Sequence, residues 1–146
     1  MTIGGELRST GNSGDGNEGC TITIVNNTSF AAALTSQNAN HGYFTQGPAS
    51  NITQMSSTTV MAQGTDGTAT GCEITFTYEL ADANNTTFTW SYEKPYDGEN
   101  SFSVTSGGKG APYYTITQNP SYSPSSDDWL TITVTIALAT APGSGS

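Results

Sequence analysis

The chain has 146 residues, a length that suits one domain, and 12 acidic residues against 3 basic ones give it a formal net charge of −9. This balance argues against nucleic acid as a partner, because the phosphates would be repelled, and against anionic lipid held by a basic patch. No segment approaches the ~20 apolar residues of a membrane span, and no basic-then-apolar signal peptide opens the chain. Abundant Thr, Ser, Asn and Gly with few charges are typical of a secreted or cell-surface β protein, which is the localisation we predict.

The first part of the chain predicts a mobile arm and then a series of short strands. Residues 1–19 are rich in Gly and Ser and predict a flexible N-terminal arm, followed by a folded domain over residues 20–140. Turn residues such as Asn26-Asn27 and Gly47-Pro48 separate the apolar segments that follow. The strands expected here are Thr21 to Val25, Phe30 to Leu34, His41 to Thr45, Asn51 to Met55 and Thr58 to Ala62.

The segment from Thr70 to Asn100 carries the clearest pattern in the chain. Between Cys72 and Leu80, apolar and polar residues alternate strictly, which predicts a strand with one dry and one wet face. Phe88, Trp90 and Tyr92 repeat this alternation after a polar turn over residues 81–85, so the two segments predict a hairpin. An aromatic loop containing glycine follows at residues 95–100.

The C-terminal part predicts further strands and no helix of useful length. A strand is expected around Phe102 and Val104, another from Tyr113 to Thr117, and a long regular one from Trp129 to Leu138. Residues 141–146 predict a flexible tail. Strands at this spacing predict an all-β, single-domain antiparallel β-sandwich of about 8–10 strands, with a closed barrel as the alternative.

Cys20 and Cys72, the two cysteines of the chain, both begin an alternating strand on its inward side. A disulfide between them would close a loop of about fifty residues and stabilise the fold by ~4 kcal/mol in the chain-entropy model. The alternative is two buried free thiols that pack as small apolar groups. We expect the disulfide. With His41 as the only histidine, these residues do not make a zinc site, and no cofactor is expected.

Catalytic motifs are scarce, so we predict that the protein is not an enzyme. There is no Gly-x-Ser-x-Gly nucleophile motif. Glu73 and Glu79 lie on an outward strand face, where a solvated carboxylate is expected rather than a glycosidase pair. The acidic stretches at residues 97–100 and 127–128 do not have EF-hand spacing. His41 is expected in a surface turn.

Tyr96 differs from the other aromatic residues because it lies in a loop, between Pro95 and Asp97. A tyrosine has an apolar body and a polar edge, which suits a sugar face, a choline-like cation or the bilayer interface. The alternative is that Tyr96 packs over its own loop. The sequence alone leaves both interpretations open.

Three motifs resemble those of the aegerolysins, small acidic β-sandwich proteins of fungi and bacteria. They are His41-Gly42-Tyr43-Phe44, then the residues from Asp66 to Gly71, and finally Phe88-Thr89-Trp90 with Pro95-Tyr96-Asp97-Gly98-Glu99-Asn100. The likeness spans roughly residues 21–138, and a weaker one exists to the actinoporin and fungal fruit-body lectin group. The resemblance implies binding of sphingolipid-type head groups and docking of a larger pore-forming partner. It also implies a ligand site that contains Asp66, Trp90, Tyr96 and Asp97.

Three functions therefore stay open from the sequence. The first is a non-enzymatic binder of membrane lipid, with Asp66 attracting a cationic head group. The second is a glycan-binding, lectin-like module that uses the same aromatic loops. The third is a structural, self-assembling extracellular protein, in which the N-terminal arm and the long terminal strand take part in strand exchange between subunits and an oligomer results.

Overall fold

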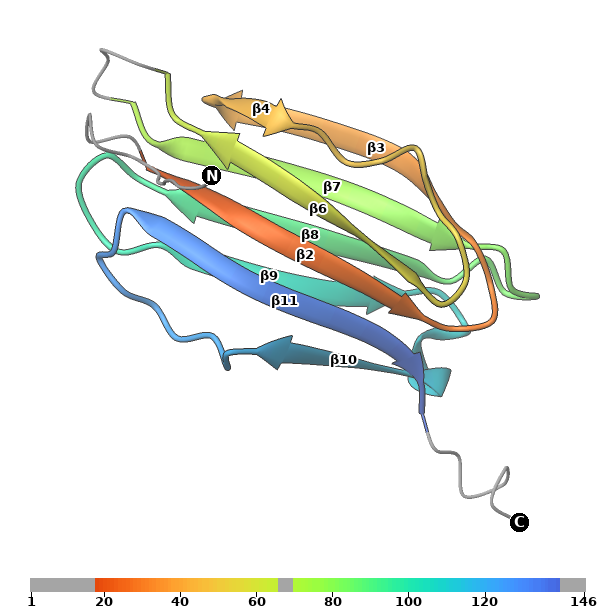
Figure 1. Cartoon of the computed structure of the whole chain (residues 1–146). Coiled ribbons are helices and arrows are strands. Elements are labelled where there is room, and N and C mark those ends of the chain that lie inside the picture. Colours follow the sequence, from red (N-terminus) through yellow and green to blue (C-terminus); the bar gives the residue numbers. More distant parts are fainter. Residues whose placement is uncertain (1–17, 66–69, 140–146) are drawn as a thin grey trace.

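Two five-stranded sheets pack face to face, and their longest buried strands show alternating apolar and polar residues (Figure 1). The structure is a computed structural model, which describes residues 18–65 and 70–139. The front sheet consists, in spatial order, of β10 (Tyr114–Asn119), β11 (Trp129–Leu138), β2 (Gly19–Asn27), β6 (Ser56–Gln63) and β4 (Tyr43–Gln46). The back sheet consists of β5 (Asn51–Ile52), β3 (Ala32–His41), β7 (Cys72–Leu80), β8 (Thr87–Lys94) and β9 (Ser101–Gly107).

The predicted all-β sandwich is confirmed, with one departure from antiparallel pairing. Strands β11 and β2 run parallel, from Trp129 opposite Gly19 to Ala137 opposite Asn27, whereas the other pairs are antiparallel. Parallel neighbours require a long connection between them, and here that connection is most of the domain. The earliest and the latest of the described strands therefore lie side by side inside the front sheet.

Side chains from the two inner faces fill the core between the sheets. Trp90 stacks on Phe76, with ring centroids 5.3 Å apart, and meets the edge of Tyr78 at 5.8 Å. Aliphatic residues of the front sheet, including Ile22 and Val134, complete the core and are fully buried. Aromatic pairs in these geometries contribute beyond their area of burial, so these rings add to the stability of the pairing between β7 and β8.

Strand bounds agree best where the alternation is strict. The strands expected at residues 72–80 and 129–138 have those bounds in the structure. Strand β3 instead extends to His41, well beyond the predicted end at Leu34, because it pairs with β7 over this length. Two register shifts in that pairing interrupt the alternation of its side chains, so the sequence pattern did not indicate where the strand ends. Gly19, which was assigned to the flexible arm, belongs to β2, and the side chain of Glu18 is buried. The predictions for residues 1–17 and 141–146 lie outside the described residues.

The structure does not contain the expected disulfide, because Cys20 and Cys72 are free thiols. They belong to facing sheets and are both buried in the core. Burial raises the pKa of the Cys72 thiol to about 12, and burial together with the nearby Cys72 raises the pKa of Cys20 as well. Both groups are therefore protonated at neutral pH and pack as small apolar side chains, which was the alternative interpretation. Over the described residues, no helix is long and apolar enough to cross a membrane.

Candidate functional site

One end of the back sheet brings together two segments that are distant in the sequence. Because β7 and β8 are antiparallel, the start of β7 at Cys72 pairs with the end of β8 at Lys94. Gly71 lies against the loop that follows β8. A Cβ atom there would lie 2.8 Å from the backbone nitrogen of Tyr96 and would collide with the carbonyl oxygen of Lys94. The absence of a side chain at Gly71 therefore allows the two segments to meet.

A hollow of about 250 Å³, which we call the acidic hollow, opens at this junction. It is lined by His41, Thr70, Gly71, Cys72, Glu73, Glu93, Lys94, Pro95 and Tyr96. These residues come from β3, β7, β8 and the loop after β8. The sheet thus supplies the carboxylates and the loop supplies the aromatic ring.

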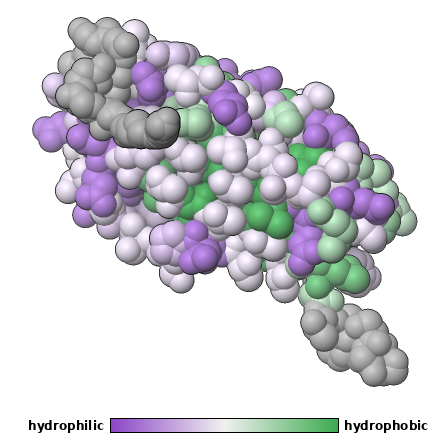
Figure 2. All heavy atoms as spheres, viewed as in Figure 1, coloured by the Kyte–Doolittle hydropathy of each residue, from purple (hydrophilic) through white to green (hydrophobic). Residues whose placement is uncertain are grey.

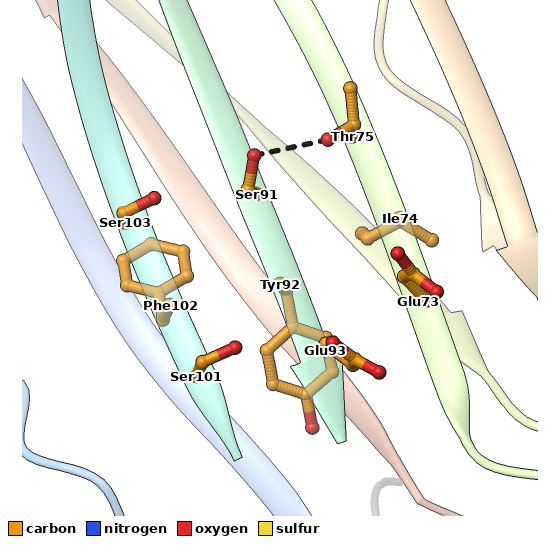
Figure 3. A pocket seen from close by; sticks show the side chains of 9 residues that line it. All are labelled: Glu73, Ile74, Thr75, Ser91, Tyr92, Glu93, Ser101, Phe102 and Ser103. Carbon is orange, nitrogen blue, oxygen red and sulfur yellow. Dashed lines mark hydrogen bonds between the residues drawn. The ribbon is translucent and has the colours of Figure 1, made fainter. Parts of the chain in front are cut away.

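Glu73 and Glu93 lie directly opposite each other on β7 and β8. Figure 3 shows both side chains on the same side of the sheet, among the residues that line a second hollow of about 210 Å³ along β7, β8 and β9. Serine and threonine hydroxyls line this second hollow, and Thr75 and Ser91 share a hydrogen bond of 3.0 Å. Opposed residues on adjacent strands have Cβ atoms about 5 Å apart, so the two negative charges repel each other.

Glu73 also contacts the neighbouring strand β3. His41 Nε2 lies 3.8 Å from Glu73 Oε1, and the Asn40 side-chain amide donates a hydrogen bond of 3.3 Å to Glu73 Oε2. The side chain of His41 is 56% exposed and that of Glu73 is 35% exposed, so both are accessible to a ligand. Contrary to the expectation of a surface turn, His41 is the last residue of β3, paired with Glu73.

Lys94 is nearly fully buried, and it contributes little positive charge to the mouth of the acidic hollow. Its ammonium group donates a hydrogen bond of 2.9 Å to the carbonyl oxygen of Pro95. It also lies near Glu18, whose pKa is raised by burial and partly lowered again by Lys94. The outer part of the hollow is therefore dominated by the carboxylates of Glu73 and Glu93.

The structure separates the four residues that sequence reasoning had placed in the site. Tyr96 is 55% exposed and lines the acidic hollow, while Asp97 is exposed in the same loop without lining it. The structure corrects the assignment of Trp90 to the site. Its strand turns the side chain inward onto Phe76, so it is only 1% exposed and cannot contact a ligand. Asp66 lies outside the described residues, and its role stays a prediction.

Sequence reasoning missed the pairing of Glu73 with Glu93. The signal was present, since a hairpin centred on residues 81–85 brings these two positions opposite each other. Within the described ranges, no three His, Cys, Asp or Glu side chains form a group that could hold a metal ion. The acidic hollow combines two carboxylates with an exposed aromatic ring, and groups of these kinds can attract an organic cation.

No protein-family model matches the chain, and no curated protein sequence matches it. Solved structures do match. RahU protein, in complex with a TRIS molecule, has a TM-score of 0.64 and 15% identity, over 85% of this chain and 97% of its own. IP-1A from Alcaligenes faecalis has a TM-score of 0.63 and 20% identity, over 84% and 92%. The lipid binding protein Nakanori has a TM-score of 0.59 and 11% identity, over 82% and 70%.

These likenesses define the class of fold, which is an aegerolysin-like β-sandwich. They support the resemblance read from the sequence at the level of the fold alone. At identities of 11–20% no functional residue is carried over from these proteins.

Proposed function

We propose that the protein is an aegerolysin-related, non-enzymatic binder of membrane lipid, and that the acidic hollow receives the cationic part of a lipid head group. Tyr96 would lie at the bilayer surface beside it. The single observation that carries this proposal is the meeting of an exposed tyrosine with two opposed carboxylates in one hollow.

The carboxylate pair supports a cationic ligand on electrostatic grounds. Glu73 and Glu93 repel each other in the free protein. An ammonium group placed between them would be attracted by both carboxylates and would relieve that repulsion. A zwitterionic lipid presents such a group at the outer edge of its head group. The net charge of −9 does not oppose this mode of binding, because the bilayer itself is neutral.

Tyr96 supports a membrane ligand rather than a free amine. It is more than half exposed in the loop between β8 and β9, at the end of the sandwich, where it can enter the head-group region of a bilayer while the strands stay paired. Tyrosine favours the head-group region of bilayers because its ring is apolar and its hydroxyl is polar, and its face also attracts cations.

The structural neighbours support the same chemical class. Nakanori is described as a lipid binding protein, and RahU was crystallised with TRIS, a hydroxylated primary amine that is cationic at neutral pH. An ethanolamine head group, like TRIS, carries a primary ammonium group close to polar oxygen atoms. The finer parts of the proposal are a preference for sphingolipids, a larger pore-forming partner and a secreted or cell-surface location. The sequence resemblance supports the first two, and the abundance of Thr, Ser, Asn and Gly supports the location.

Vesicle binding tests the proposal. We expect the protein to sediment with liposomes that contain sphingomyelin or ceramide phosphoethanolamine more than with phosphatidylcholine alone. Tyr96→Ala and the double variant Glu73→Gln, Glu93→Gln should each weaken binding at least about fivefold. Absence of binding to all three compositions would contradict the proposal.

Two matched controls lie at the other end of the sandwich, Glu79 on β7 and Tyr113 in the short 3-10 helix Ala111–Tyr113. Tyr113, 57% exposed, matches Tyr96, and Glu79 faces outward from β7 as Glu73 does, with Thr87 opposite it. Tyr113→Ala and Glu79→Gln should leave vesicle binding unchanged. Equal losses in the control variants would show that general surface charge, and not the hollow, determines binding. Binding on a glycan array without lipid would favour the lectin-like alternative.

A further inference from the structure

The two outer faces of the sandwich differ completely in charge. The five strands of the front sheet are described throughout and contain no Asp, Glu, Lys or Arg, whereas the outer face of β7 and β8 in the back sheet carries Glu73, Glu79 and Glu93. Figure 2 shows the front sheet as a broad area of neutral and apolar side chains, with hydrophilic residues gathered toward its rim. An uncharged face of this extent is unusual in a chain with a net charge of −9.

The side chains of this front face lie in regular rows across the strands. Thr23 is the middle residue of β2, which is the middle strand, and it lies between Thr133 of β11 and Thr59 of β6. The hydroxyl oxygens of Thr23 and Thr59 are 3.5 Å apart. Val25 and Met61 occupy neighbouring outward positions on the same strands, so methyl and thioether groups alternate with hydroxyls. Charged residues are depleted at the centres of protein interfaces, as they are on this face.

The area of the front face is sufficient for a dimer. Five strands about 4.8 Å apart and about eight residues long cover roughly 600 Å². Two such faces in contact would bury roughly 1,200 Å², the lower limit of a standard specific interface. We propose that two copies of this chain associate face to face through their front sheets.

Charge favours this arrangement over contact between two back sheets. Contact between back sheets would bring Glu73, Glu79 and Glu93 of both copies together without compensation. Contact between front sheets places the two back faces outward, about 30 Å apart across four stacked sheets. That distance is several Debye lengths at physiological salt, so the repulsion between them is largely screened.

The proposal fixes the symmetry of the dimer and the position of its centre. A face that meets its own copy forms an isologous, two-fold interface, in which residues near the axis contact their equivalents. Thr23 lies at the centre of the front sheet and is therefore expected near that axis. A charge placed there would face the same charge in the partner copy.

Analytical ultracentrifugation of the full chain, from micromolar to submillimolar concentration, tests the proposal. We expect twice the monomer mass at the higher concentrations. Thr23→Glu and Thr23→Lys should each raise the dissociation constant at least about tenfold, and an equimolar mixture of the two should recover at least about half of the wild-type dimer. Circular dichroism checks that each variant is folded.

Thr77 provides the matched control. It is an outward threonine near the middle of β7, the middle strand of the back sheet, and its hydroxyl lies 2.9 Å from that of Thr89. Thr77→Glu and Thr77→Lys should leave the dissociation constant within about twofold of wild type.

A wild-type chain that is monomeric throughout would overturn the proposal, as would equal weakening by the Thr23 and Thr77 variants. A monomer whose vesicle binding is lost on Thr23→Glu would also overturn it and assign the front face to the membrane. Because these variants leave the acidic hollow intact, failure of this proposal and failure of lipid binding are separate outcomes.

Discussion

Glu73 and Glu93 form a cross-strand pair of like charges on β7 and β8, at the mouth of the acidic hollow. Proteins seldom place two carboxylates opposite each other without a cation, because such pairs destabilise a sheet. The pair therefore links the stability of the free protein to its proposed ligand.

Glu93→Gln should raise the free energy of unfolding by about 0.2–1 kcal/mol, because it removes this repulsion. Urea denaturation at low ionic strength measures the gain, and added salt should reduce the difference between the two proteins. Glu79→Gln serves as the comparison, since Glu79 faces Thr87, and its stability should change little. A loss of stability in Glu93→Gln would mean that the carboxylate pair is already compensated in the free protein.

Trp90 should matter for stability and not for ligand contact. Trp90→Ala would leave a large cavity beside Phe76 and Tyr78, and we expect it to cost about 3–5 kcal/mol. Trp90→Phe should cost only about 1–2 kcal/mol, because it keeps the ring stack and removes an indole N–H that is buried without a hydrogen-bond partner among the described residues. Vesicle binding per folded molecule should be unchanged in Trp90→Phe. A selective loss of binding in that variant would restore Trp90 to the site.

The two thiols should be inert in the folded protein. With Cys20 and Cys72 both buried and the pKa of Cys72 raised to about 12, an aromatic disulfide reagent at pH about 8 should react only as fast as the protein opens. In denaturant without reductant, both thiols should react at once. Failure to detect two thiols after unfolding would show that the cysteines are joined and that the disulfide predicted from the sequence exists.

Asp82 should make part of the stability depend on acid. Its carboxylate accepts hydrogen bonds of 3.0 and 2.7 Å from the backbone and hydroxyl of Thr86 and one of 2.8 Å from the Tyr114 hydroxyl, which joins the β7–β8 turn to the front sheet. Burial alone would raise the pKa of Asp82, but these hydrogen bonds and one from the Asn84 backbone lower it below its usual value.

Because the folded pKa is lowered, this contribution is complete above the unfolded pKa of about 4 and is lost as the pH falls through the folded value. Asp82→Asn should cost about 1–3 kcal/mol at neutral pH. Wild type should then lose more stability than Asp82→Asn between pH about 5 and about 2. Thermal unfolding over that range makes the comparison. Parallel pH profiles for the two proteins would show that the network does not depend on the charge.

The fold followed from the sequence where one face of a strand is buried and the other is solvated. Strands β7 and β11 have that environment along their whole length, and their bounds were predicted correctly. Strand β3 is mostly exposed and contains two register shifts, so its alternation carries little information about where it ends. The parallel pairing of β2 with β11 is a tertiary relation between distant segments, and alternation within each strand does not encode it.

The candidate site was predicted only in part, for a similar reason. The loop position of Tyr96 left open whether the ring is exposed or packs over its own loop, and the structure shows that it is 55% exposed. Trp90 was assigned to the site through a motif, although its alternation with Phe88 and Tyr92 already indicated the core. Glu73 was read as a lone solvated carboxylate, because its partner Glu93 becomes apparent only when the hairpin register is worked out.

The position of β11 between β2 and β10 has a consequence for folding during synthesis on the ribosome. Strand β2 is made well before β11, yet β11 is one of its two neighbours in the sheet. The nascent chain must therefore hold an incomplete sheet, with an open hydrogen-bonding edge, until residue 138 has been added. Closure of the sandwich has to wait for β11, and a stop codon before this strand would release a chain unable to close.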